Sequence, residues 1–142
     1  MDAINIKILA CLQQNARMTN AAISRDVGIS SPAVTERIRK MEDLGIIKGY
    51  KAQVDPFALG YQMKAIITLR AFMGKLKPFL EAVKQWDEVV NCYRVTGNEN
   101  IIMVVTLKNQ KHLEAFIDQL IGYGESKTQI VLAKVVDGNP IL

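Results

Sequence analysis

The feature that most constrains this chain is a change of hydrophobic period at residues 44–45. Before it, apolar residues recur every three to four positions, the spacing of a helix that buries one face. After it, strand-sized apolar runs alternate with helical stripes. The pattern predicts an α+β protein with a helical DNA-binding-type domain at residues 1–50, a strand and linker at 51–61, and an α/β domain at 62–142.

The first domain has the start and stop signals of a helix-turn-helix. An amphipathic helix ends near residues 15–17, and Thr19 can cap a second helix that Gly28 ends in a left-handed conformation. We expect Ser31 to cap the third helix, with Pro32 at its first position, where no needed backbone donor is lost. Three short helices with a tight glycine turn between the last two form this motif.

The second domain is predicted to be a ferredoxin-like sheet. Strands are expected at Met63–Phe72, Val89–Thr96, Ile101–Leu107 and Thr128–Val136, helices at 76–86 and 113–121, and a preceding short strand at Ile46–Val54. The order β-α-β-β-α-β is that of the split βαβ fold, in which both helices cover one face of an antiparallel sheet. Because the strands are apolar on both faces, the uncovered face predicts a partner subunit.

The start of the third helix is the part of a helix-turn-helix that enters the major groove of DNA. The side chains that can reach base edges are Ser31, Ala33, Thr35, Glu36, Arg37 and Arg39. Since Val34 and Ile38 face the core, the helical period should turn outward Ala33, Glu36, Arg37 and Lys40. We expect Arg37 to read guanine and Glu36 to accept from a cytosine amino group. Phosphate contacts are expected from Arg17, Arg25, Arg39 and Lys40.

Other interpretations of these charges stay open. The net charge of +4 divides into +2 for residues 1–60 and +2 for residues 61–142, which is compatible with DNA binding without establishing it. Glu36 and Lys40 also form an i, i+4 pair of the kind that solvent-exposed helices carry. Helix-turn-helix units serve in protein contacts as well.

Stretches along nearly the whole chain resemble, in the same order, the Lrp/AsnC (feast/famine) transcription regulators. They are Ile29–Ile47, Val54–Pro56 with Leu59–Gly60, Val95–Gly97 and Ser126–Leu132. Thr35–Arg37 and Gly45–Lys48 are especially similar to the LrpC-type members. The resemblance implies a winged helix-turn-helix followed by a ligand-sensing α/β domain.

The resemblance also implies a function. Members of the family regulate transcription, frequently of amino-acid metabolism, and many bind an amino-acid effector between dimers. The expected partners are double-stranded DNA and copies of the same chain, which dimerise through their sheets and commonly assemble into octamers. We expect a cytoplasmic, nucleoid-associated protein, since the sequence has neither a signal-peptide pattern nor the stretch of about 20 apolar residues that a membrane helix needs.

The implied effector contacts are Gly97, Asn98 and Asn100 in a turn, and Ser126 and Thr128 on the last strand. The family usually has aspartate at the position of Asn100, where it meets the amino group of the ligand. A neutral amide offers no charge-assisted partner, and the adjacent Glu99 should point to the other face of its strand. The sequence therefore predicts effector binding that is weakened, altered in specificity or lost.

An enzyme is not expected. The single histidine, His112, is predicted to be a solvated residue at a helix start, and no catalytic motif accompanies it. Haem-pathway decarboxylases share this overall build but depend on histidines that the chain lacks. Cys11 and Cys92 match no disulfide or metal pattern and are predicted to be buried thiols, with no cofactor. Two alternatives stay open: an effector-independent DNA-bending protein, and a stand-alone sensor that binds another regulator.

Overall fold

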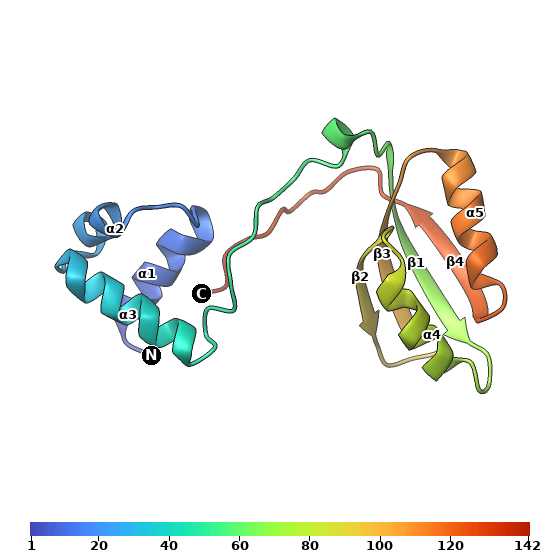
Figure 1. Cartoon of the computed structure of the whole chain (residues 1–142), viewed down its shortest axis with the longest axis horizontal. Helices are drawn as coiled ribbons and strands as arrows, with labels where there is room; N and C mark the ends of the chain where they lie inside the picture. The colour runs from blue at the N-terminus through green and yellow to red at the C-terminus, as the bar shows by residue number, and fades with distance from the viewer. The chain divides into compact units, whose positions relative to one another are not determined.

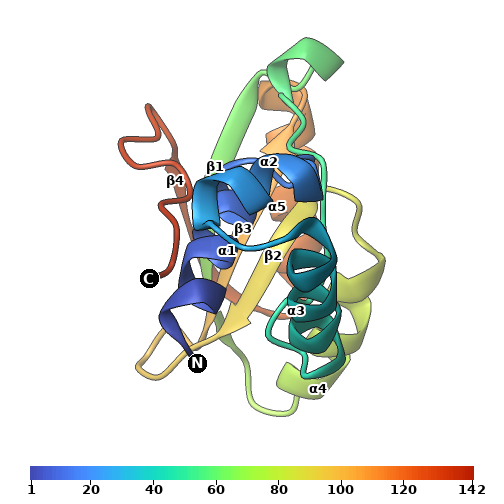
Figure 2. The same cartoon turned by 90° about the vertical axis from the view of Figure 1, so that its left-hand side faces the viewer.

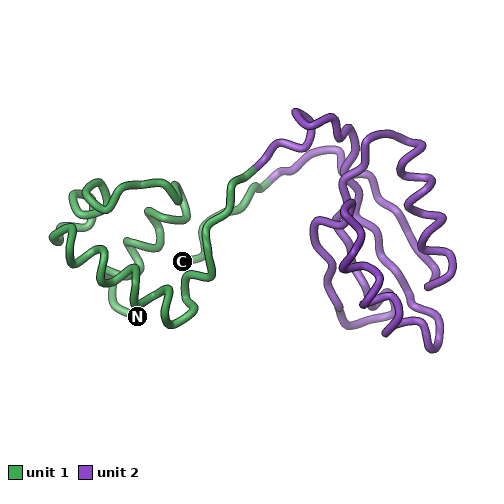
Figure 3. The backbone as a smooth tube through the Cα atoms, viewed as in Figure 1, with its two compact units in different colours: residues 1–53, 136–142 green, residues 54–135 purple.

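The structure is a computed structural model that describes residues 1–142. The chain forms two compact units. Unit one consists of Met1–Gln53 together with Val136–Leu142, and unit two consists of Val54–Val135 (Figure 3). The chain therefore passes between the units twice, and its C-terminal segment returns to the unit that holds the N-terminus.

Unit one is built from three helices, each capped by a side chain. They are α1 (Ala3–Gln14), α2 (Asn20–Val27) and α3 (Ser31–Asp43) (Figure 1). The side-chain oxygens of Asp2, Thr19 and Ser30 accept backbone N–H groups of the first turns. The cap of α3 is thus Ser30 and not the expected Ser31, because Ser30 has an extended backbone while Ser31 is already helical.

The turn between α2 and α3 makes this unit a helix-turn-helix, as predicted (Figure 2). Gly28 ends α2 with a φ of 81°, a region that glycine enters without a Cβ clash. The hydroxyl of Ser24 donates to the carbonyl of Ile29, and the amide of Asn20 donates to the hydroxyl of Thr35 at 2.8 Å. The core between the helices is filled by Ile8, Leu9, Ile23, Val34 and Met41.

The segment after α3 differs from the prediction. Residues 46–54 form no strand, although a strand was expected at Ile46–Val54. A strand needs a neighbour for its ladder hydrogen bonds, and the sheet of this chain pairs no other element with the segment. The backbone N–H groups of Ile46 and Ile47 instead donate to the carbonyl of Met41 and close the end of α3.

Unit two is a four-stranded antiparallel sheet with helices on one face (Figure 1). Its elements are the 3₁₀ turn η1 (Phe57–Leu59), β1 (Met63–Ala71), α4 (Leu76–Ala82), the 3₁₀ turn η2 (Val83–Gln85), β2 (Val89–Arg94), β3 (Ile101–Leu107), α5 (Gln110–Leu120) and β4 (Gly124–Ile130). The strand order β2-β3-β1-β4 confirms the predicted ferredoxin-like split βαβ fold.

The last strand lies earlier in the chain than predicted. β4 pairs with β1 over Gly124–Ile130, whereas the apolar pattern predicted Thr128–Val136. Beyond it, the N–H of Val131 still donates to the carbonyl of Lys64. Residues 132–136 are exposed and outside any strand, because no strand lies beside them to complete a ladder.

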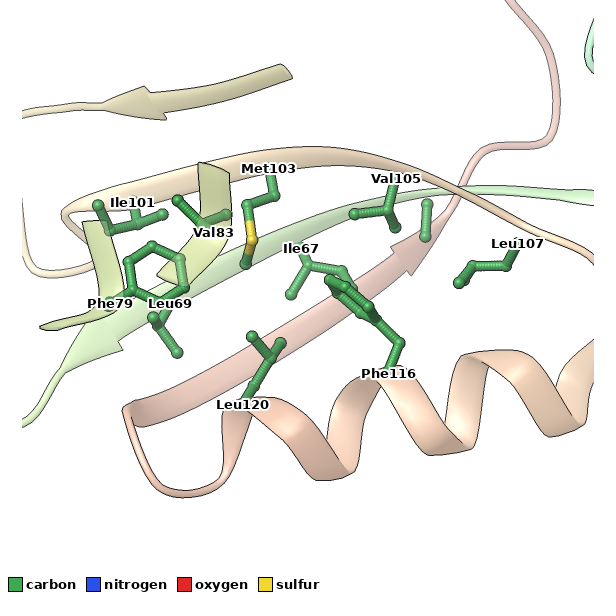
Figure 4. Packing of buried hydrophobic residues seen from close by; sticks show 11 residues of the cluster. Ile67, Leu69, Phe79, Val83, Ile101, Met103, Val105, Leu107, Phe116 and Leu120 are labelled. Carbon is green, nitrogen blue, oxygen red and sulfur yellow. The ribbon is translucent and has the colours of Figure 1, made fainter. Parts of the chain in front are cut away.

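The core of unit two lies between the sheet and its helices. Alternate residues of β1 and β3 are buried, and Phe79 of α4 and Phe116 and Leu120 of α5 pack against them (Figure 4). The rings of Phe79, Trp86, Phe116 and Tyr123 meet edge to face, with centroids 5.7–5.8 Å apart. Such pairs contribute about 0.5–1.5 kcal/mol each beyond their buried area, so they fix the helices on the sheet.

The opposite face of the sheet carries no helix. On it, Ile66 and Val104 are cross-strand partners, and Thr68 and Ile102 form the next pair. These four side chains are half-buried, while Tyr93, paired with Ile102, is 53% exposed. The uncovered face is therefore apolar along its middle, as the sequence predicted.

Candidate DNA-binding face and ligand site

The outward face of α3 presents an ion-pair ladder. The Arg39 guanidinium lies 2.9 Å from Glu36 Oε1 and 3.0 Å from Asp43 Oδ2, and Lys40 Nζ lies 3.9 Å from the same Glu36 oxygen. The hydrogen bond from Arg39 holds the pKa of Glu36 below its usual value. A phosphate that binds Arg39 therefore competes with the carboxylates of Glu36 and Asp43, and one that binds Lys40 competes with Glu36.

Arg37 does not point outward as expected. Its Nη1 donates to Asp2 Oδ2 at 2.7 Å and to Asn5 Oδ1 at 2.8 Å, and the side chain is only 31% exposed. The hydrogen bond from Arg37 holds the pKa of Asp2 below its usual value. Arg37 thus ties α3 to the first turn of α1, because Asp2 and Asn5 supply two acceptors that the period of α3 does not reveal.

The remaining predicted DNA contacts fall into two groups. Ser31 and Ala33 are half-buried at the start of α3, and Thr35 is exposed but donates to the carbonyl of Ser31 at 3.0 Å. Arg17 and Arg25 are exposed and form no ion pair. The start of α3 therefore presents polar and small side chains, with free cations on the neighbouring segments.

A polar hollow of about 300 Å³ lies in unit two, where β1 and β4 meet the turn between β2 and β3. It is lined by Arg70 of β1, Asn98 and Glu99 of the β2–β3 turn, and Glu125, Ser126 and Lys127 of β4. Two of the predicted effector residues, Asn98 and Ser126, are thereby brought together. Arg70, Glu125 and Lys127 were not predicted, although the polar start of β4 is visible in the sequence.

Two close ion pairs line the hollow. Lys127 Nζ lies 2.6 Å from Glu99 Oε1, and Arg70 Nη2 lies 2.7 Å from Glu125 Oε2. The hydrogen bond from Lys127 holds the pKa of Glu99 below its usual value. Glu99 lies in the turn before β3 and lines the hollow, whereas the neighbouring Asn100 does not, so the two side chains differ in direction.

Comparison with known proteins decides the family. Residues 1–48 match the winged helix-turn-helix DNA-binding family, and residues 64–141 match the Lrp/AsnC ligand-binding domain. The chain belongs to the Lrp/AsnC family of transcriptional regulators. The HTH-type transcriptional regulator Ptr1 of Methanocaldococcus jannaschii is 32% identical over 98% of this chain and 97% of its own length.

Solved Lrp/AsnC-type structures show the same fold. A transcriptional regulator of Neisseria meningitidis, solved as a complex with L-Met, is 26% identical, covers 100% of this chain and 96% of its own, and has a TM-score of 0.94. Bacillus subtilis LrpC is 25% identical over 96% of this chain and 97% of its own, with a TM-score of 0.91. The chain is thus a DNA-binding transcriptional regulator and not an enzyme. None of its helices is long and apolar enough to cross a bilayer.

Three predicted effector positions of this Lrp/AsnC protein lie outside the hollow's lining: Gly97, Asn100 and Thr128. Asn100, where the family usually has aspartate, uses its Oδ1 to accept the N–H of Ala71 at 3.4 Å. Thr128 lies on β4 opposite Ile67, two positions beyond Ser126. Asn100 thus supports the end of β1, while charged side chains around it line the hollow.

His112 has a structural role that differs from the predicted one. It is half-buried in the first turn of α5, not solvated. Its Nδ1 accepts the N–H of Lys108 at 3.1 Å, and its Nε2 lies 3.1 Å from Glu88 Oε1. With Nδ1 accepting, Nε2 carries the proton and donates to the carboxylate, so His112 links α5 to the start of β2.

Proposed function

We propose that this Lrp/AsnC regulator binds specific DNA sequences through α3 and changes that binding when an amino acid enters the hollow of unit two. The ligand part of the proposal rests on this hollow, because two carboxylates and two cations line it. A zwitterion can pair its ammonium group with Glu99 or Glu125 and its carboxylate with Arg70 or Lys127. The Neisseria relative solved with L-Met supports the ligand class.

In this proposal the carboxylates of the hollow supply the negative charge that Asn100 lacks. At that position a neutral amide already accepts a backbone N–H, so it offers the ligand no charge. Glu99 sits next to it in the chain and lines the hollow with a low pKa, so it is ionised at neutral pH. We assign the ammonium partner to Glu99, with Ser126 as a neutral neighbour, and expect ligand specificity to differ from relatives that use aspartate.

On the DNA side, the proposed base contacts come from the start and outward face of α3. They are Ser31, Ala33, Thr35 and Glu36. Arg39 and Lys40 are proposed to leave the Glu36 carboxylate and bind DNA phosphates instead. Arg17 and Arg25 are proposed phosphate contacts because their charges are exposed and unpaired. Arg37 is proposed to act indirectly, by holding α3 in position.

The uncovered sheet face supports a homodimer. Its apolar middle around Ile66 and Val104 has no cover within the chain. A second copy that places the same face against it makes a closed, two-fold interface. We propose that such dimers assemble further, up to an octamer, on DNA in the nucleoid.

Calorimetric titration with the twenty L-amino acids and their D-enantiomers tests the ligand proposal. We expect at least one L-amino acid to bind stereoselectively, and Glu99→Gln to weaken that binding about tenfold or more, since a charge-assisted bond is lost. Glu114→Gln, an exposed change on α5, is the matched control. A wild-type protein that binds none of these ligands would reject the proposal.

The neutral Asn100 favours one alternative, a DNA-bending protein that needs no effector. Footprinting separates the two functions. A protected site of one or two helical turns whose strength changes with an amino acid supports the regulator. Long, phased protection that ignores every amino acid supports the bending protein.

A further inference from the structure

The C-terminal segment Val136–Leu142, called the tail here, is anchored to α1. The Nε2 of Gln13 donates to the carbonyl of Ile141 at 2.9 Å, and its Oε1 accepts the N–H of the same residue at 2.8 Å. A primary amide thereby copies the pairing of a β-strand, in which one residue donates to and accepts from a single partner. Such pairing recognises an extended backbone rather than a particular side chain.

A groove of about 390 Å³ lies beside this pair within unit one. Its walls are mainly apolar and come from α1 and from the segment after α3, with Leu9, Leu12, Ile47 and Tyr50 among them. Ile141 and Leu142 lie along the groove, yet they stay 79% and 73% exposed. The backbone hydrogen bonds with Gln13, more than side-chain burial, therefore hold the tail.

We propose that unit one carries a docking groove for an extended peptide segment and that the occupant is the chain's own tail, bound through its backbone by Gln13. The tail continues the chain that leaves β4, the strand that supplies Ser126 and Lys127 to the hollow. The tail, held by its hydrogen bonds with Gln13, thus gives β4 a second connection to unit one, in addition to the linker that follows α3. The N-terminal turn of α1 is the one that holds Arg37.

Hydrogen exchange of the Ile141 amide in the full-length protein, followed by NMR, tests the docking. We expect exchange about tenfold slower than in an unstructured peptide, as one hydrogen bond of ordinary strength predicts. Gln13→Ala should abolish this protection. Gln14→Ala, a change of the neighbouring exposed residue, should leave it intact. An unprotected Ile141 amide in the wild type, or protection that survives Gln13→Ala, would overturn the proposal.

Two changes in the tail separate backbone recognition from side-chain packing. Ile141→Ala keeps the backbone N–H and should preserve the resonance positions of the Gln13 side-chain amide. Ile141→Pro removes that N–H and should shift the Gln13 amide to its free position. Equal effects of both substitutions would show that side-chain contacts hold the tail and would overturn the assignment to Gln13.

A mixing experiment tests whether the tail belongs to the same chain. Isotope-labelled Gln13→Ala protein is mixed with unlabelled wild type and its subunits are exchanged. If each tail docks on its own chain, the labelled Ile141 amide stays unprotected. Recovered protection would show docking on a second copy and would overturn the proposal that the occupant is the chain's own tail.

Discussion

Arg37 on α3 donates to Asp2 at the start of α1 at a distance of 2.7 Å, and its second acceptor, Asn5, lies 2.8 Å away. Asp2 also caps α1 by accepting the N–H of Asn5 at 2.8 Å. The Asp2 carboxylate therefore caps the start of α1 and also binds the Arg37 guanidinium of α3. We therefore propose that Arg37 is a positioning residue, which affects DNA binding through the placement of α3.

Arg37→Ala should weaken binding to operator and to random DNA by similar factors. The variant should also lower the Tm of the protein by a few degrees, because the link between α3 and α1 is lost. Competition binding and thermal denaturation measure the two effects. Arg25→Ala, which removes an exposed cation without an ion pair, should leave the Tm unchanged. A selective loss on operator, by about 1–3 kcal/mol, would instead show that Arg37 reads a base.

Glu36→Gln should raise the affinity for random DNA. The substitution removes a carboxylate that competes with phosphate for Arg39 and Lys40. The plot of log K against log salt should become steeper by about one counterion, and fluorescence anisotropy at several salt concentrations measures it. Asp26→Asn, an exposed change on α2, controls for net charge. Weaker binding to random DNA would contradict this account of the ladder.

Val104→Asp should dissociate the dimer while leaving unit two folded. Val104 lies on the sheet face away from the helices, between buried Met103 and Val105. A carboxylate there is solvated in the monomer, but in a sheet-to-sheet dimer its desolvation costs on the order of several kcal/mol. Light scattering reports the mass, and circular dichroism the fold. A folded variant of unchanged mass would place the dimer interface elsewhere.

The fold could be predicted from the sequence because the residues that repeat with the helical and strand periods are the ones buried in the cores. Val34 and Met41 in α3, and Met103 and Val105 in β3, lie where the helical and strand periods place them. The ends of elements were harder to predict, because they depend on partners distant in sequence. β4 ends at Ile130 where its pairing with β1 ends, although the apolar run continues.

Dependence on partners distant in sequence also explains why the directions of the site side chains were hard to predict. The helical period alone placed Arg37 outward, and the acceptors that bind it come from the start of the chain. Glu99 and Lys127 are far apart in sequence, and only the strand order brings them together. The contacts of long polar side chains depend on which groups the fold brings near them, so residue type and period do not determine their direction.

Gly124→Ala should destabilise the protein by about 1–3 kcal/mol. A Cβ on Gly124 would lie 2.2 Å from the carbonyl oxygen of Arg70 and 2.9 Å from the Cα of Ala71, both backbone atoms of β1. The strands would have to separate where β4 begins. Gly122→Ala, whose added Cβ meets no atom within 4 Å, should change the free energy of unfolding by less than about 0.5 kcal/mol. Urea denaturation compares the two, and equal stabilities would contradict the close approach.

Tyr50 should titrate with a pKa of about 12 in the folded protein, since partial burial and the nearby Glu42 carboxylate both oppose the phenolate. The phenol donates to Glu42 Oε1 at 2.8 Å, so the neutral form is the one that the fold stabilises. Because the pKa rises on folding, this contribution is complete below pH 10 and is lost as the pH rises from about 10 to 12. Ring carbon chemical shifts of labelled tyrosine measure the titration. Glu42→Gln should lower the pKa of Tyr50, and a pKa that this substitution leaves unchanged would assign the whole shift to burial.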